Sequence, residues 1–270
     1  MITFPNAKIN IGLHITEKRS DGFHNIETVM YPVPFTDVLE FVESDALRFD
    51  SSGLPIDSSP GQNLVLKAYH LLKEKYDLPP IHIHLHKYIP MGAGLGGGSS
   101  DAAFMLKMLN DHFSLNIQED ELENFAGRLG SDCAFFIRNR PVYASGKGEL
   151  MKPVDLDLSE IYILLVKPPF GISTQEAYNK VIPQKSRLSL KALVDFSLIQ
   201  WKSNINNQFE KTLFPVHPEL AEIKEKLYHL GAVYASMTGS GSAVYGLFRS
   251  NPERFIQYFS SGYFTFTSRL

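Results

Sequence analysis

The sequence predicts an α+β fold built from two packed halves. Segments typical of strands and of helices alternate along the 270 residues, but without the regular period of a doubly wound parallel sheet. Several strand segments alternate apolar and polar residues, as expected for sheets with one solvated face. A chain of this length usually forms about two domains. We expect one domain over residues 1–155 and a second over residues 156–270.

The composition is that of a globular protein with its own core. Hydrophobic residues make up 44% of the chain and charged residues 20%, which excludes a disordered chain. The net charge of −3 argues against a general nucleic-acid-binding protein. There is a single cysteine, and no apolar run approaches the roughly 20 residues that span a bilayer. We therefore expect a soluble, cytoplasmic protein with no nucleic-acid or membrane partner.

The first half of the chain mixes strands and helices. Apolar residues at helical spacing predict a helix over 63–76. In residues 81–88 isoleucine or leucine alternates with histidine, which predicts a strand with one polar face. The other predicted elements are strands over 2–16, 38–42 and 46–49, a turn at Ser20–Gly22, helices over 99–110 and 119–129, and buried strands over 133–137 and 162–166.

The second half repeats this mixed pattern. A helical stripe of leucine and isoleucine over 220–230 is closed by Gly231. The elements predicted after it are a strand over 233–237, a glycine turn over 238–241, a strand over 243–248, a helix over 251–259 and a strand over 263–268.

The strongest functional signal is a glycine-rich run from Pro90 to Ser100. Five of the seven residues from Gly92 to Gly98 are glycine, so the backbone can adopt positive φ and approach a ligand closely. The run precedes a predicted helix, whose N-terminal N–H groups and dipole favour an anion. We interpret it as a phosphate-binding loop rather than a flexible turn. It lacks a Walker lysine, and the histidine-rich strand before it argues against a Rossmann site.

Three other features are candidates for chemistry, and each has a plainer interpretation. The glycine turn Thr238–Ser242 is either a tight hairpin or a second clamp on a phosphate chain. Asp132 follows the helix-ending Gly130 and could act as a general base, although the local sequence favours a turn or capping role. Lys8 and Asn10 share one strand face, which suits an anionic site but is more often a solvated face.

Two features are interpreted as structural. His82, His84 and His86 share a strand face, but no carboxylate or cysteine motif accompanies them. A solvated face is therefore favoured over a metal site. Cys133 has no basic neighbour in the sequence, so it is interpreted as a small core residue rather than a nucleophile.

Together these motifs resemble the GHMP small-molecule kinases. The resemblance runs essentially end to end, with the motifs in family order. The segments that carry it are Pro5–Leu13, Arg19–His24, Asn63–Ala68, Pro90–Ser100, Gly130–Asp132, Pro168–Thr174 and Thr238–Gly241. The implied fold is the two-domain α+β GHMP fold, with ATP and the acceptor in the cleft between the domains.

The resemblance also implies an ATP-dependent kinase that uses Mg²⁺. Asp132 would take the proton from the acceptor hydroxyl, and Lys8 would steady the developing alkoxide. No protein residue is assigned to the metal. The residues implied to wrap the ATP phosphates are Pro90, Met91, Gly92, Ala93, Gly94, Leu95, Gly96, Gly97, Gly98, Ser99 and Ser100.

The acceptor implied by the resemblance is cytidine diphospho-methylerythritol, a small molecule of the non-mevalonate isoprenoid pathway, phosphorylated on its 2-hydroxyl. Asn10 would lie beside this acceptor, and His24 would read the edge of the cytosine. Phe23 and Tyr178 would stack on the two faces of the base, with Thr174 nearby. The chain is expected to be a monomer or a weak homodimer.

Two positions depart from the family pattern. Phe23 stands where the family often has tyrosine, and Cys133-Ala134 replaces the common Val-Pro. Two other functions stay open at this point: another GHMP kinase, acting on homoserine or mevalonate, and a non-catalytic nucleotide sensor on the same fold. The presence of both Lys8 and Asp132 argues against the sensor, which needs no base.

Overall fold

The structure, a computed structural model, describes residues 1–56, 60–179, 181–184, 189–193 and 195–270. By contacts the chain divides into two compact units. The first unit comprises residues 1–7, 35–91 and 96–140, and the second comprises residues 8–34, 92–95 and 141–270. This division differs from the linear boundary expected at residue 155, because part of the N-terminal segment pairs with strands that follow residue 140.

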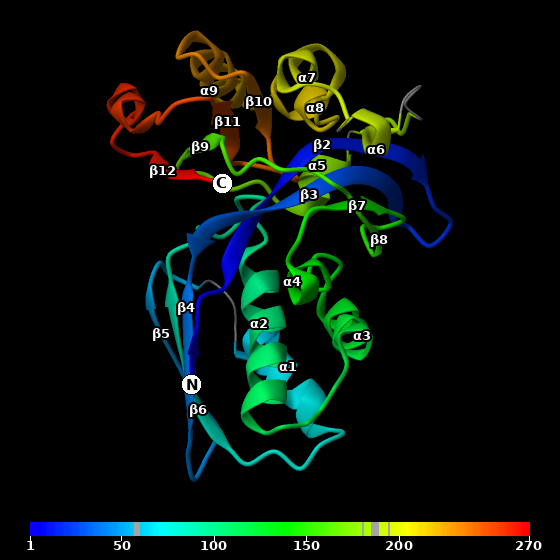
Figure 1. Cartoon of the computed structure of the whole chain (residues 1–270), viewed down its shortest axis with the longest axis vertical. Helices are drawn as coiled ribbons and strands as arrows, with labels where there is room; N and C mark the ends of the chain where they lie inside the picture. Colours follow the sequence, from blue (N-terminus) through cyan, green and yellow to red (C-terminus); the bar gives the residue numbers. More distant parts are fainter. Residues whose placement is uncertain (57–59, 180, 185–188, 194) are drawn as a thin grey trace. The chain divides into compact units, whose positions relative to one another are not determined.

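The first unit is one four-stranded sheet with helices. Its strand order is β1-β4-β6-β5, and β5 alone runs parallel to its neighbour. Figure 1 shows α1, α2 and α3 on one side of this sheet. The elements are β1 (Ile2–Thr3), β4 (Val38–Glu43), β5 (Arg48–Gly53), η1 (Pro60–Gln62), α1 (Leu64–Lys73), β6 (Ile81–Lys87), α2 (Gly97–His112), α3 (Glu119–Leu129) and α4 (Phe135–Arg138).

The predicted half-exposed strand is confirmed in β6. Ile81, Ile83 and Leu85 are buried against the helices. On the other face, His82 lies 2.6 Å from an Asp50 carboxylate oxygen, and the remaining histidines also meet polar side chains. Within the described ranges, no cluster of metal-ligating side chains occurs here or elsewhere.

The helices of the first unit begin and end close to their predicted positions. Asn63 caps α1, because its side-chain oxygen accepts from the N–H of Val65 at 2.9 Å and of Leu66 at 3.4 Å. Helix α2 begins at Gly97, two residues before the predicted start at Ser99. Of the helices in the described part of the chain, none has both the length and the apolar character that crossing a membrane requires.

The second unit contains two four-stranded sheets. Their strand orders are β2-β3-β7-β8 and β10-β11-β9-β12. The strands are β2 (Asn6–Lys18), β3 (His24–Thr36), β7 (Val142–Ser145), β8 (Leu150–Pro153), β9 (Tyr162–Lys167), β10 (Tyr234–Met237), β11 (Val244–Phe248) and β12 (Phe264–Arg269). Its helices are α5 (Thr174–Asn179), α6 (Leu190–Leu193), α7 (Leu198–Asn204), α8 (Glu210–Leu213), α9 (Pro218–His229) and η2 (Glu253–Tyr258).

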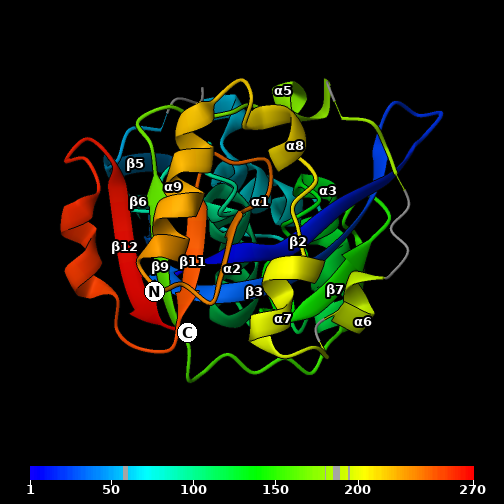
Figure 2. The same ribbon diagram turned by 90° about the horizontal axis from the view of Figure 1, so that it is seen from above.

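The core of the second unit forms where α9 covers its second sheet (Figure 2). Leu220, Ile223 and Leu227 recur at helical spacing on α9 and are all buried. They pack with strand residues such as Leu164 and Val244 in one apolar cluster. The helical stripe predicted over 220–230 and the strands on either side of the second glycine turn are therefore confirmed.

Several local predictions are wrong or incomplete, and the strands β3, β7 and β8 were not predicted. Residues 133–137, predicted as a buried strand, form a turn followed by α4. A short apolar run has no periodicity that separates a buried strand from a buried helical turn. The helix predicted over 251–259 is the 3₁₀ helix η2. Helices α5 to α8 were not predicted, because four to seven residues are too few to show an amphipathic repeat.

Candidate active site

The first glycine-rich loop joins β6 to α2. Gly92, Gly94 and Gly96 have φ values of 61°, 73° and 72°, in the left-handed region that other residues rarely adopt. Gly96 is the N-cap of α2 and provides no side-chain hydrogen bond to the helix. The first-turn N–H groups of a helix have no carbonyl partner within it, so this end of α2 can donate to an anion.

The tip of this loop packs on the second glycine turn inside the second unit. Thr238 donates its hydroxyl hydrogen to the Gly94 carbonyl at 3.1 Å, and the N–H of Ser242 donates to the Gly92 carbonyl at 3.2 Å. A Cβ on Gly94 would lie 2.1 Å from the Thr238 carbonyl oxygen, so a side chain has no room there. The structure thus brings together the two glycine motifs that the sequence singled out.

Lys8 and Asn10 lie beside this junction. The Lys8 ammonium donates to the Asn10 side-chain oxygen at 2.5 Å and to the Gly94 carbonyl at 3.1 Å. The Asn10 amide nitrogen donates to Thr28 Oγ1 at 3.0 Å. Lys8 is 3% exposed and Asn10 2% exposed. The shared strand face is confirmed, and the interpretation as a solvated face is wrong: both side chains are buried in a polar network.

Asp132 belongs to the first unit and lies in the turn between α3 and α4. The turn is closed by the Cys133 N–H, which donates to the Gly130 carbonyl at 3.1 Å. Cys133 is fully buried, and burial raises the pKa of its thiol to about 11. Cys133 is therefore a neutral core residue, as predicted. Because Asp132 and Lys8 belong to different units, their action as a pair stays a prediction.

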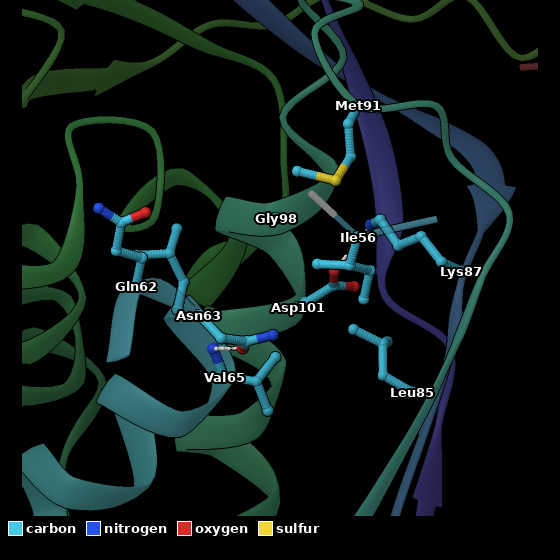
Figure 3. A pocket seen from close by; sticks show the side chains of 10 residues that line it. Ile56, Gln62, Asn63, Val65, Leu85, Lys87, Met91, Gly98 and Asp101 are labelled. Atoms are coloured by element: carbon cyan, nitrogen blue, oxygen red, sulfur yellow. Dashed lines mark hydrogen bonds and ion pairs between the residues drawn. The ribbon is translucent and has the colours of Figure 1, made fainter. Parts of the chain in front are cut away.

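A cavity of about 310 Å³ opens in the first unit next to the start of α2 (Figure 3). Apolar side chains form most of its wall, and a few polar groups come from the start of α1, the end of β6 and Asp101 in the second turn of α2. This composition is typical of small-molecule sites. The lining residues are Ile56, Gln62, Asn63, Leu64, Val65, Leu85, Lys87, Met91, Gly98 and Asp101.

One wall of this cavity contains a buried group of three charges. The Lys87 ammonium donates to Asp37 and, at 2.7 Å, to Asp101. The Asp37 carboxylate also accepts from the N–H groups of Tyr88 and Ile89 at 2.6 and 2.7 Å. Oδ1 of Asp101 is buried and has no partner among the described residues. Burial, with Asp37 nearby, outweighs Lys87 and raises the pKa of Asp101 to about 7.

Sequence reasoning missed this charged group, although β6 contains a signal for it. The residues on the buried face of β6 are Ile81, Ile83, Leu85 and then Lys87. A lysine at a buried position of an alternating strand requires buried carboxylates nearby. Asp37 and Asp101 lie far from Lys87 in the sequence and could not be identified as its partners from the pattern alone.

The residues expected to bind the acceptor base lie near the β2–β3 hairpin and on α5. The rings of His24 and Tyr178 stack, with centroids 4.9 Å apart and planes 25° apart. Phe23 is 59% exposed, and the Lys147 ammonium lies 4.9 Å from its ring centroid. We expected a cytosine sandwich, in which the base stacks between the rings of Phe23 and Tyr178, whereas in the structure the ring of His24 faces Tyr178. The sandwich therefore stays a prediction.

Burial and the nearby Lys18 lower the pKa of His24. At neutral pH its imidazole is therefore uncharged and offers one donor and one acceptor. The hydrogen-bonding edge of cytosine likewise combines an amino donor with ring acceptors. The expected contact of His24 with that edge stays a prediction.

Two family models match the chain. GHMP kinases N terminal domain matches residues 63–140, and GHMP kinases C terminal matches residues 189–264. The chain belongs to the GHMP kinase family. The proteins named 4-diphosphocytidyl-2-C-methyl-D-erythritol kinase from Parabacteroides distasonis and Bacteroides thetaiotaomicron are 53% and 54% identical to it, each over 92% of both chains.

Solved structures agree with this family. A crystal structure of 4-(cytidine 5'-diphospho)-2C-methyl-D-erythritol kinase matches with a TM-score of 0.82 and 28% identity, over 99% of this chain and 98% of that one. The mevalonate kinase of Methanococcus jannaschii matches with a TM-score of 0.73 and 13% identity, over 100% and 98% of the two chains, which shows the GHMP kinase fold alone. The α+β fold class and the family resemblance predicted from the sequence are confirmed.

The loop junction generates a first prediction. Replacing Gly94 by alanine puts a Cβ against the Thr238 carbonyl oxygen and imposes an unfavourable positive φ. We expect the G94A variant to lose ATP binding in calorimetry. The matched control is Gly127→Ala on α3, where a Cβ meets no atom within 4 Å. If G94A bound ATP as tightly as G127A, the junction would not position the phosphate loop.

The charged group in the cavity generates a second prediction. The pKa of Asp101 is raised on folding, so the folded protein holds a proton that the unfolded chain releases, and stability falls as pH rises from about 4 to about 7. Asp101→Asn removes this dependence. We expect the melting temperature of D101N, relative to wild type, to rise between pH 5.5 and pH 8. A melting-temperature difference between D101N and wild type that stays constant across this pH range would contradict the raised pKa of Asp101.

Proposed function

We propose that this GHMP kinase transfers the γ-phosphoryl group of ATP to the 2-hydroxyl of 4-(cytidine 5'-diphospho)-2-C-methyl-D-erythritol. The observation that carries the proposal is the junction at Gly94, where both glycine motifs and the buried Lys8 meet. If the turn at Thr238 only joined two strands, it would need neither a close backbone contact with a distant glycine loop nor a buried ammonium beside it. The relatives named for this reaction, at 53% and 54% identity, support the choice of acceptor.

The first unit has the features that an ATP site requires. The apolar cavity beside α2 suits a purine base, with Asn63 and Gln62 as polar groups on its wall. The glycine loop that follows β6 leads from this cavity to the N-terminus of α2, where the N–H groups can bind phosphate oxygens. The Ser100 hydroxyl in the first turn is buried and without a partner among the described residues.

The residues present also fit Mg²⁺. This ion keeps several water ligands and is usually bound through phosphate oxygens with one or two protein oxygens, so a cluster of three acidic side chains is not needed. When bound, Mg²⁺ neutralises charge on the phosphate chain during transfer. We propose no protein ligand for it.

In the proposed reaction, Asp132 accepts the proton of the 2-hydroxyl. The oxygen then bonds to the γ-phosphorus while the bond from that phosphorus to the bridging oxygen breaks, and ADP leaves with the electron pair. Lys8 supplies a fixed positive charge, because Asn10 and the Gly94 carbonyl hold its ammonium in place. Phosphoryl transfer depends mainly on such positioning and charge stabilisation.

The experiment that tests the proposal offers the purified protein Mg-ATP with one acceptor at a time. Phosphorus NMR identifies the product and the position of the new phosphate. We expect a phosphomonoester on the cytidyl methylerythritol compound and no product with homoserine or mevalonate. Phosphorylation of another acceptor instead would overturn the assigned substrate. ATP binding without transfer to any of the three would favour the nucleotide sensor.

A third prediction concerns the base. Asp132→Asn replaces a carboxylate by an amide that cannot accept the hydroxyl proton. We expect kcat to fall about 10²- to 10⁴-fold while ATP affinity measured by calorimetry is retained. Circular dichroism checks that the variant is folded. A kcat within a few-fold of wild type would show that Asp132 is not the base.

A fourth prediction concerns the cytosine. Stacking of a base on an aromatic ring is worth about 1–3 kcal/mol by alanine substitution, which corresponds to roughly 5- to 150-fold in affinity. We therefore expect Tyr178→Ala to raise KM for the cytidyl acceptor by that factor and to leave KM for ATP nearly unchanged. Tyr178→Phe, which keeps the ring, and Phe23→Tyr are controls expected to be close to neutral. An effect on KM for ATP alone would contradict the cytosine site.

A further inference from the structure

Lys167, the last residue of β9, has a role that neither the sequence motifs nor the reaction assigns. Its ammonium donates to two backbone carbonyls, Pro168 at 3.0 Å and Phe170 at 3.1 Å. The pKa of Lys167 is lowered by burial, and no charged neighbour in the described part of the chain offsets this. An ammonium that loses water without gaining a carboxylate is costly unless carbonyl oxygens replace the water. The two carbonyls of this short segment are therefore tied to Lys167.

The Phe170 carbonyl has a second donor, which links it to the glycine turn. Ser242, which is fully buried, donates its hydroxyl hydrogen to the Phe170 oxygen at 2.6 Å. The N–H of the same Ser242 donates to the Gly92 carbonyl at 3.2 Å. A Cβ placed on Gly171 would lie 3.4 Å from the Gly92 oxygen, so the two backbones pack closely. Residues 168–171 thus lie directly against the first glycine loop.

The other end of the segment leads into α5. The phenyl ring of Phe170 stacks on His217, with centroids 5.2 Å apart and planes 23° apart. His217 in turn lies 2.9 Å from a carboxylate oxygen of Glu176, a residue of α5. The helix α5 also contains Thr174 and Tyr178, the two residues of this helix expected to contact the acceptor. Phe170 is therefore held through its carbonyl on one side and through its ring on the other.

We propose that Lys167 is a positioning residue for phosphoryl transfer: through the Phe170 carbonyl it fixes the segment 168–173 and so sets the spacing between the glycine loops and α5. The inference rests on the proposed function, because it takes α5 as the part that holds the cytosine. The acceptor is long, with its base at one end and the reacting hydroxyl at the other. A shift of about 1 Å between the two ends can cost on the order of 10²-fold in rate.

Two variants of Lys167 separate positioning from simple packing. Lys167→Met keeps most of the aliphatic chain and removes the ammonium, whereas Lys167→Arg keeps a donor with positive charge. We expect K167M to lower kcat/KM for the cytidyl acceptor about 10- to 100-fold, within the range for misplacement of reacting groups. K167R should restore it to within about threefold of wild type, and ATP affinity in calorimetry should change less than about twofold in both variants. Lys152→Met, an exposed lysine on β8, is the matched control.

A double-mutant cycle tests the shared carbonyl. Ser242→Ala removes the second donor to the Phe170 oxygen. If both side chains act through that one carbonyl, the loss in kcat/KM of the double variant is smaller than the product of the two single losses by about threefold or more. Losses that multiply would show that Lys167 and Ser242 act separately and would overturn the proposed route.

Hydrogen exchange supplies a readout that does not depend on the acceptor. We expect the amides of residues 170–179 to exchange at least about tenfold faster in K167M than in wild type, with exchange in α9 unchanged. If wild type fails to phosphorylate the cytidyl acceptor, the proposed function is wrong, and the exchange result still decides whether Lys167 fixes the segment. If wild type is active while K167M shows unaltered exchange and unaltered kcat/KM, the positioning role is wrong and the function stands.

Discussion

The contact between the two glycine motifs at Gly94 is the constraint on which the site of this kinase depends. Hydrogen bonds alone could be made by many residues, but the space between the Gly94 Cα and the Thr238 carbonyl has no room for a Cβ. The same Gly94 carbonyl accepts from the Thr238 hydroxyl and from the Lys8 ammonium. A single backbone oxygen therefore fixes the loop, the turn and the charged side chain relative to one another.

The buried Lys87 of the first unit and the half-buried Lys167 of the second unit are balanced differently. In the first unit two carboxylates, Asp37 and Asp101, surround Lys87, which leaves one negative charge in excess when both are ionised. In the second unit the partners of the Lys167 ammonium, among the residues that the structure describes, are two backbone carbonyl oxygens. A carboxylate pair locks an ammonium strongly but makes the site sensitive to pH, whereas carbonyl dipoles hold it without adding a titrating group.

The sequence predicted many of the local features and few of the long-range ones. The glycine loop was identifiable because positive φ and close approach require glycine at Gly92, Gly94 and Gly96. The common face of Lys8 and Asn10 follows from strand geometry. Strand geometry does not predict that Lys8 and Asn10 are buried, because their burial depends on Gly94 and Thr238. Gly94 and Thr238 are 144 positions apart in the chain. Pairing over such distances leaves no trace in periodicity, and neither do single helical turns such as α4.

The N-terminus of α2 lacks a side chain to complete it. Serine, threonine, aspartate and asparagine are preferred at a helix N-cap because their side chains bond first-turn N–H groups, and α1 uses Asn63 in this way. At α2 the equivalent position is Gly96, which has no side chain, so the first-turn N–H groups are left for a bound molecule. A bound phosphate would thus serve as the missing cap. A nucleotide concentration of 100 times Kd would add about 2.7 kcal/mol to the free energy of unfolding. The stability of the folded protein would then rise and fall with the nucleotide concentration around it.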